Sequence, residues 1–347
     1  MSARGRRAPV VGLALLAVLA VGVLLSAAVG QLAIAPTEVV GAALEGMGIH
    51  TSWAPGSDVT SQALWQIRFP RVVMSVLVGA ALAVAGAVMQ AIFGNPLAEP
   101  GVVGVSSGAA LGAAFAIVTG AALGSVASVA AFAFAGGVGV TLLVYAMARA
   151  NGRTEVVTLL LTGIAVNAFA GAGLALLLFL GDAAAREQIV FWQLGSLNGT
   201  RWPEVAVVAV LAVIGIAVAA ALAPRYDLLA LGERTAAHLG VRVERLRIVS
   251  ILVVAVLTGA AVAYAGIIAF VGLVVPHVMR LALGPAHRAL LLASALGGAV
   301  LLTYADVAAR TLVTGAELPI GLLTSLVGGP FFFWLLRRQR SRSGGWA

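Results

Sequence analysis

Residues 93–108 read FGNPLAEPGVVGVSSG, and this stretch decides the fold because two prolines and four glycines interrupt a strongly apolar region. Proline removes a backbone donor and disrupts a helix interior, so the stretch cannot be one regular helix. Irregular backbone at membrane depth is tolerated only where it is buried in protein or lines a water-filled cavity. We therefore expect residues 93–108 to line a passage or a gate inside a membrane protein.

The composition of the whole chain places this stretch in a membrane. Of the 347 residues, 61% are hydrophobic and 10% are charged, whereas an average soluble domain has about 45–50% and about 25%. So few charges cannot cover the surface of a soluble protein of this size. The composition also excludes a disordered chain, a DNA-binding domain and a disulfide scaffold, and the absence of cysteine excludes a thiolate metal site.

Apolar runs predict an all-α fold with ten transmembrane helices, because each bilayer crossing needs about 20 mostly apolar residues. Residues 10–30 are longer than the apolar core of a signal peptide, so we expect a retained first helix. The eighth span is short and contains Pro276, which makes nine the competing count. The predicted spans lie near 10–30, 72–92, 101–119, 124–148, 156–180, 204–223, 246–265, 267–283, 289–309 and 318–336.

The distribution of arginine predicts the orientation of these spans. All 21 basic residues are arginine, and with the N-terminus inside, sixteen of them fall on the inner side. An excess of basic residues marks cytoplasmic segments, so we expect both termini in the cytoplasm and an even number of spans. The net charge of +8 is therefore no sign of nucleic-acid binding. The outer exceptions are Arg68, Arg71, Arg186, Arg201 and Arg310.

Two similar segments indicate an internal repeat. Residues 78–86 read VGAALAVAG and residues 258–266 read TGAAVAYAG, and each is followed ten residues later by a proline, Pro96 or Pro276. The segments lie on the second and seventh predicted spans, which cross the membrane in opposite directions. This pattern predicts an inverted-topology repeat of helices 2–5 and 7–10, an arrangement that many transporters use around a midplane pathway.

Five motifs in order carry a resemblance to a known family. The chain resembles the permease subunits of bacterial ABC importers for iron-siderophores, haem and vitamin B12 (the FecCD/BtuC-like family) from about residue 10 to residue 338. The motifs are RFPR at 68–71, NPLAEPGVVGVSSG at 95–108, GERTAAHLG at 232–240, GLVVPH at 272–277 and ELPIG at 317–321. The resemblance implies one permease domain over residues 1–347, in a bacterial cytoplasmic membrane.

The same resemblance implies a set of partners. The permease would form a homodimer, or pair with a homologous permease, around one central pathway. It would bind two cytoplasmic ABC ATPase subunits and an extracytoplasmic substrate-binding protein. ATP and Mg would be bound by the partner ATPase, because the chain has no lysine to complete a Walker A motif. We expect no cofactor or metal on the chain itself and no enzymatic activity of its own.

Candidate site residues at the outer side are arginines. By resemblance, Arg68, Arg71 and Arg310 would dock the binding protein through its acidic side chains, for which arginine offers bidentate geometry. Contact with lipid headgroups is the alternative for these outer arginines. Asp306 lies one helical turn before Arg310 and is a possible internal partner.

Candidate residues at the inner side fall in a predicted cytoplasmic coupling loop, 224–247, and in the interrupted stretch. A short helix ended by glycine fits residues 232–240, and the resemblance makes it the ATPase-coupling helix. Asn95 and Leu97 would belong to the inner gate, although Asn-Pro is also turn chemistry. His277, after Pro276, would cap freed backbone groups, and an axial ligand to haem is the alternative that we do not favour. The remaining coupling and pathway candidates are Gly232, Glu233, Ala236, Leu239, Gly240, Ser106 and Ser107.

The expected function is transport of an iron-chelate, haem or a ferric siderophore, by alternating access driven by partner ATPases. A cobalamin permease of the same family is the first alternative. An ion-coupled secondary transporter is the second, and it requires a carboxylate inside the membrane, which we do not expect from Asp306 or Glu317 near the outer ends of spans. A membrane-embedded hydrolase built on Ser106 is the third, because residues 104–108 fit the pattern G-x-S-x-G.

Overall fold

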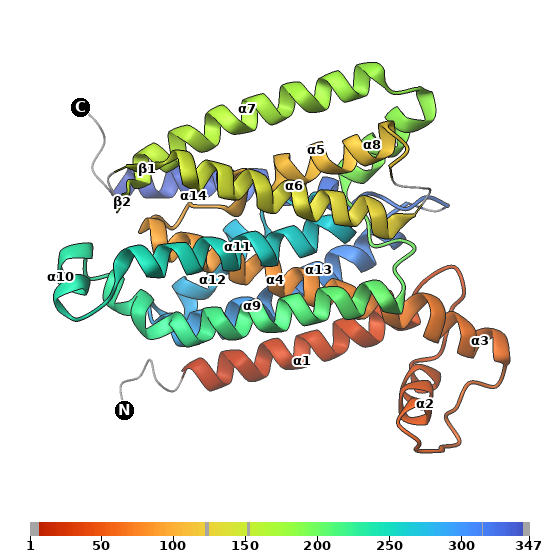
Figure 1. The fold of residues 1–347 in the computed structure, drawn as a ribbon. Coiled ribbons are helices and arrows are strands. Elements are labelled where there is room, and N and C mark those ends of the chain that lie inside the picture. Colours follow the sequence, from red (N-terminus) through yellow and green to blue (C-terminus); the bar gives the residue numbers. More distant parts are fainter. Residues whose placement is uncertain (1–6, 122–124, 151–152, 314, 343–347) are drawn as a thin grey trace.

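The computed structural model describes residues 7–121, 125–150, 153–313 and 315–342. Within these ranges the fold is helical except for one antiparallel pair of two-residue strands (Figure 1). This confirms the all-α class predicted from the sequence. The elements are α1 (Arg7–Ala28), α2 (Pro36–Gly46), α3 (Asp58–Gln62), η1 (Ala63–Arg68), α4 (Phe69–Phe93), η2 (Pro100–Val103), α5 (Val105–Val118), α6 (Val126–Met147), β1 (Arg149–Ala150), β2 (Arg153–Thr154), α7 (Val156–Leu180), α8 (Ala183–Leu194), α9 (Trp202–Leu229), α10 (Glu233–His238), α11 (Val243–Ala265), α12 (Val271–Leu283), α13 (His287–Thr311) and α14 (Ile320–Arg342).

Seven helical segments in the described ranges are long and apolar enough to cross a membrane: α1, residues 58–93 ending with α4, α6, α7, α9, α11 and α13. Three shorter apolar helices, in α5, α12 and α14, would bring the number to ten. Ten crossings stays a prediction. Helix α1 begins, and α14 ends, at the end of the bundle that carries α10 and the strands; this is called the inner end below (Figure 1). Helices α2, α3 and α8 lie at the opposite, outer end.

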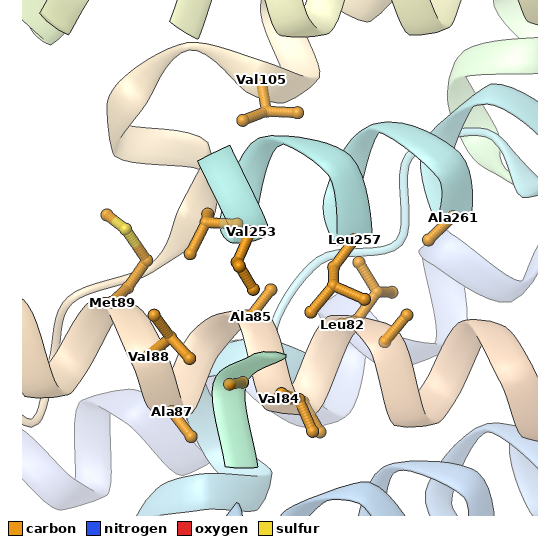
Figure 2. Close-up of a cluster of buried hydrophobic side chains, with 14 of the residues drawn as sticks. Leu82, Val84, Ala85, Ala87, Val88, Met89, Val105, Val253, Leu257 and Ala261 are labelled. Atoms are coloured by element: carbon orange, nitrogen blue, oxygen red, sulfur yellow. The ribbon is translucent and has the colours of Figure 1, made fainter. Parts of the chain in front are cut away.

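The interior of the bundle is built around α4 and α11. In the most apolar window of each, 78% and 72% of residues are buried, against 17% for both α1 and α7. The two helices run in opposite directions, and Val253 and Leu257 of α11 point toward Ala85 and Leu82 of α4 (Figure 2). Helices α4 and α11 therefore form the interior of the bundle and α7 lies at its periphery, although all three are similarly apolar; apolarity alone does not select the interior helices, because lipid is as apolar as their side chains.

Glycine makes the close approaches around α4. A Cβ at Gly86 would overlap the backbone of Gly272 at the start of α12, and one at Gly79 would overlap the backbone of Gly298 in α13. Small residues let helix backbones approach closely and so supply much of the packing between membrane helices. The glycine-rich repeat segment in the sequence is therefore the surface on which α12 and α13 pack.

The inverted repeat is visible in how these helices end. Both α4 and α11 are followed by irregular backbone and then by a short helix, α5 or α12. The two prolines that strengthened the repeat in the sequence are not equivalent, however: Pro96 lies in a turn before α5, whereas Pro276 lies inside α12. That part of the sequence argument was wrong, because the short helices begin at different distances from the glycine-rich segments.

The inner loop between α9 and α11 is shorter than the predicted 224–247. Helix α9 continues past Pro224 to Leu229, so the connection is residues 230–242 and includes α10. Proline costs α9 one hydrogen bond in its interior, but Tyr226 is fully buried just beyond it, and its hydroxyl group lies 2.8 Å from that of Ser250. This packing keeps the last turn of α9 helical.

Replacing Gly86 tests the close approach. Gly86→Ala introduces a methyl group against Gly272 backbone that cannot retreat, and overpacking of this kind costs about 1–3 kcal/mol. We expect a lower melting temperature in detergent, measured by scanning fluorimetry. Gly139→Ala in α6 is the matched control, since a Cβ there has nothing within 4 Å. Equal melting temperatures for the two variants would contradict the packing described here.

Candidate functional site

The outer end of α1 is closed by two arginines from distant parts of the chain. A helix leaves its last four carbonyl groups without helical partners. The Arg68 guanidinium donates to the carbonyls of Ala27 and Ala28, at 2.8 Å for Ala28, and also to Leu32. Arg310 Nη2 donates to the carbonyl of Ser26 at 3.0 Å. A cation at a helix C-terminus is favourable also because of the helix dipole.

Arg71 forms the buried centre of the same cluster. Its side chain is 8% exposed, and its Nε donates to Asp306 Oδ1 at 2.9 Å while its Nη1 donates to Glu317 Oε1 at 3.0 Å. Asp306 is fully buried, and Arg310 Nε lies 3.2 Å from its second carboxylate oxygen. The structure thus brings Arg68, Arg71 and Arg310 together, and each has partners inside the chain.

This outer arginine cluster (Arg68, Arg71, Asp306, Arg310 and Glu317) borders a pocket of about 460 Å³ at the outer end. The structure adds a role that the sequence argument did not include, which is to cap α1 and to join it to α4 and α13. Docking of a binding protein on these arginines stays a prediction. It would require acidic groups to compete with backbone carbonyls or with Glu317 for the guanidinium groups.

Removing the central carboxylate tests the structural role of the cluster. Asp306→Asn leaves the two adjacent guanidinium groups of Arg71 and Arg310 without a full counter-charge, and breaking a buried ion pair costs about 3–5 kcal/mol. We expect a lower melting temperature and a lower folded yield in detergent. Asp58→Asn is the control, because Asp58 is exposed in α3 and none of the hydrogen bonds or ion pairs of the described residues involves its carboxylate. A variant as stable as the control would contradict this role.

At the inner end, the predicted short helix is α10. Gly232 precedes it with φ 103° and Gly240 follows it with φ 87°, backbone conformations that favour glycine. Ala236 is fully buried, whereas Leu239 is 57% exposed. Glu233, at the first position of α10, forms an ion pair with Arg247 of α11. The helix therefore has a buried anchor and presents an exposed apolar side chain.

The four gate and pathway candidates occupy two separate places. Asn95 Oδ1 accepts a hydrogen bond from the Leu97 N–H at 2.9 Å, so this pair forms a turn after α4. Ser106 and Ser107 lie beyond η2, in the first turn of α5. The Ser107 hydroxyl donates to Asn167 Oδ1 at 2.5 Å, which links the start of α5 to α7. The turn that the sequence predicts at Asn95 is present. A gate role for these four residues stays a prediction.

The sequence argument missed two polar residues, one within this interrupted region and one in the helix before it. Glu99 Oε1 accepts a hydrogen bond from the Phe270 N–H at 3.3 Å, and Phe270 has φ 68° at the start of α12. That backbone conformation is strained for a bulky residue. Glu99 is thus a carboxylate lodged between the two interrupted segments, α4–α5 and α11–α12. The sequence signal that could have identified Glu99 is the position of a carboxylate between two prolines in an apolar stretch.

Gln90 is the second missed residue, and it corrects the interpretation of His277. Pro276 has no N–H, so the carbonyl four residues earlier, on Gly272, loses its helical partner. Gln90 Nε2 lies 3.5 Å from this oxygen and 3.3 Å from that of Leu273. The freed backbone is therefore satisfied by Gln90 of α4, while the buried His277 Nδ1 has no hydrogen-bond partner among the described residues.

The architecture of interrupted helices around a buried antiparallel pair, with a short glycine-flanked helix at one end, defines a membrane-embedded transport subunit. The chain belongs to the FecCD transport family, whose model matches residues 18–338. This confirms the resemblance seen in the motifs. The family consists of membrane components of transport systems rather than of enzymes.

Individual relatives agree with this assignment. The hemin transport system permease protein HmuU of Yersinia pestis is 42% identical over 306 residues, covering 86% of this chain and 90% of the relative. The cobalamin import system permease protein BtuC of Halobacterium salinarum is 45% identical over 277 residues, covering 80% of this chain and 74% of the relative. The Fe(3+)-citrate import system permease protein YfmD of Bacillus subtilis is 41% identical over 275 residues, covering 79% and 81%.

A solved structure shows the same fold. A metal-chelate type ABC transporter in an inward-facing conformation matches with a TM-score of 0.83 and 30% sequence identity. The match covers 95% of this chain and 99% of the other chain. The likeness therefore extends over the whole helical bundle rather than over a part of it.

Proposed function

We propose that the chain is the membrane permease of an ATP-driven importer that brings a metal chelate into the cytoplasm. The observation that carries this proposal is the family match, which spans residues 18–338. The three relatives described above are permeases of import systems, and each is matched over more than 70% of its length. The chain would supply the pathway, and a separate ATPase would supply the energy.

The inner end is the proposed site of ATPase contact. Helix α10 is held by the buried Ala236 and exposes Leu239, so it can enter a cleft on a partner without unfolding. In this proposal Gly232, Glu233 and Gly240 define its ends. The inner end would lie in the cytoplasm, which agrees with the arginine distribution.

The outer end is the proposed site of binding-protein contact, through the pocket beside the outer arginine cluster. A second copy of the chain, or a homologous permease, would complete the central pathway. Support for these partners comes from the relatives, which are named as components of import systems. The cargo would be an iron-chelate, with haem as the first candidate because of the 42% identity with the hemin permease over 90% of its length.

Cobalamin is the second candidate cargo, favoured by 45% identity to a cobalamin permease. An uptake experiment separates the two. The chain is reconstituted in proteoliposomes with its ATPase and binding protein, and uptake of haemin, ferric citrate and cobalamin is measured with ATP and with a non-hydrolysable analogue. We expect ATP-dependent uptake of haemin at least about tenfold above that of the other two, the discrimination expected from about 1.4 kcal/mol. Preferential cobalamin uptake would replace haem as the cargo, and uptake without ATP would contradict an ATP-driven importer.

The ATPase contact is tested on Leu239. Leu239→Ser removes an exposed apolar side chain that we expect to be buried by the ATPase, which is worth about 1.5–3 kcal/mol, so less ATPase should co-purify with the permease. Leu312→Ser, at an exposed leucine of the outer end, is the control and should retain the ATPase. The measurement is the ratio of ATPase to permease after affinity purification. An equal ratio for the two variants would contradict the proposed contact.

A further inference from the structure

Thr154 is a junction between three elements of the inner end. It is the last residue of β2, two positions before α7 begins, and it is 4% exposed. Its N–H donates to Glu244 Oε2 at 3.1 Å, and its hydroxyl donates to Glu244 Oε1 at 2.6 Å. Its carbonyl accepts a hydrogen bond from Arg247 Nη1 at 2.9 Å. The first two turns of α11 therefore bind the backbone N–H, the backbone carbonyl and the side chain of Thr154, which leads into α7.

Arg247 extends this junction to α10. While one arm of its guanidinium group binds the Thr154 carbonyl, the other arm donates to the Glu233 carboxylate at the start of α10. The Arg247 side chain is 8% exposed and that of Glu233 is 57% exposed. One planar group thus connects the surface helix α10 to the segment between α6 and α7. Arginine is suited to this because its donors point in fixed directions, which a lysine cannot reproduce.

The network borders an open cleft at the inner end. A cavity of about 710 Å³ at the inner end is lined by residues of β2, α10 and α11, with Thr154, Glu233, Glu244 and Arg247 among them. The two hydrogen bonds of Arg247, at the wall of this cleft, are the side-chain link that the described residues show between α10 and the α6–α7 connection. Tyr145 of α6 strengthens the same network by donating its hydroxyl proton to Glu244 Oε1 at 2.8 Å.

We propose that Arg247 is a positioning residue that makes α10 and the α6–α7 connection move together, so that a displacement of α10 reaches the inner end of α7. This rests on the proposed function, in which the ATPase displaces α10. We expect α7 to be the element that responds, because it lies at the periphery of this chain: 17% of its most apolar segment is buried in the bundle, against 72% for α11. Without the Arg247 link, α10 would move and α7 would not follow.

The experiment uses the permease with its ATPase and haemin-loaded binding protein in proteoliposomes, and measures haemin taken up per ATP hydrolysed. For Arg247→Ala we expect ATPase association and hydrolysis within about twofold of wild type. We expect uptake per ATP to fall about tenfold, because a charge-assisted bridge is lost. A residue that only stabilised the fold would lower yield, uptake and hydrolysis together and would leave their ratio unchanged.

Three further variants control the result. Arg245→Ala removes an exposed arginine of the same turn of α11 that has no hydrogen bond or ion pair within the described ranges, and should leave the ratio unchanged. Arg247→Lys keeps the charge but cannot serve both partners, so it should recover only part of the coupling. Glu233→Gln weakens only the contact between Arg247 and α10. This variant tests the proposal if Arg247→Ala fails to fold. In the double variant that carries both Arg247→Ala and Glu233→Gln, the loss of uptake per ATP should be smaller than the sum of the losses in the two single variants, because the two groups form one contact.

The outcomes separate this inference from the proposed function. Absence of ATP-driven uptake by the wild-type complex would overturn the proposed function and the inference with it. Normal wild-type uptake, together with an unchanged ratio in Arg247→Ala and Glu233→Gln, would overturn the inference alone. Loss of the ATPase from both variants would also overturn it, because Arg247 would then hold the ATPase contact rather than transmit its movement.

Discussion

The structure depends on satisfying the backbone polar groups wherever a helix stops or breaks. Within a bilayer no water is available for this, so each break needs a partner from the protein. Arg68 and Arg310 bind the carbonyls at the end of α1. Gln90 lies against the carbonyl freed by Pro276, and Glu99 accepts from the strained Phe270. These breaks make an interrupted bundle possible, and each is closed by a side chain from elsewhere in the sequence.

The same constraint gives the two ends of the bundle different properties. At the outer end, a dense cluster of arginines and carboxylates joins α1, α4 and α13, so these helices are held as a unit. At the inner end, Arg247 joins α10 to the segment that leads into α7, beside an open cleft. The two ends of the bundle are therefore held by different sets of contacts, while α4 and α11 form the buried interior between them.

Much of the fold was accessible from the sequence because apolar length and small-residue patterns are local properties. Helices are present in every predicted span, and α7 begins and ends at the predicted residues, 156 and 180. The glycines that flank α10 marked its ends for the same reason. The exceptions are also physical: α9 continues past Pro224 because Tyr226 is buried there, and Pro96 and Pro276 occupy unlike positions because the short helices start at different distances from the repeat.

The sequence by itself determined the membrane class, the family, the location of the helices and the identity of the outer arginines, since these depend on composition and on motifs of adjacent residues. Only the tertiary structure decided what those residues contact. Arg71 finds Asp306 and Glu317 more than 230 positions away, and Arg247 joins Thr154 to Glu233. No local pattern encodes such pairs, because they arise from how the packed helices place their ends.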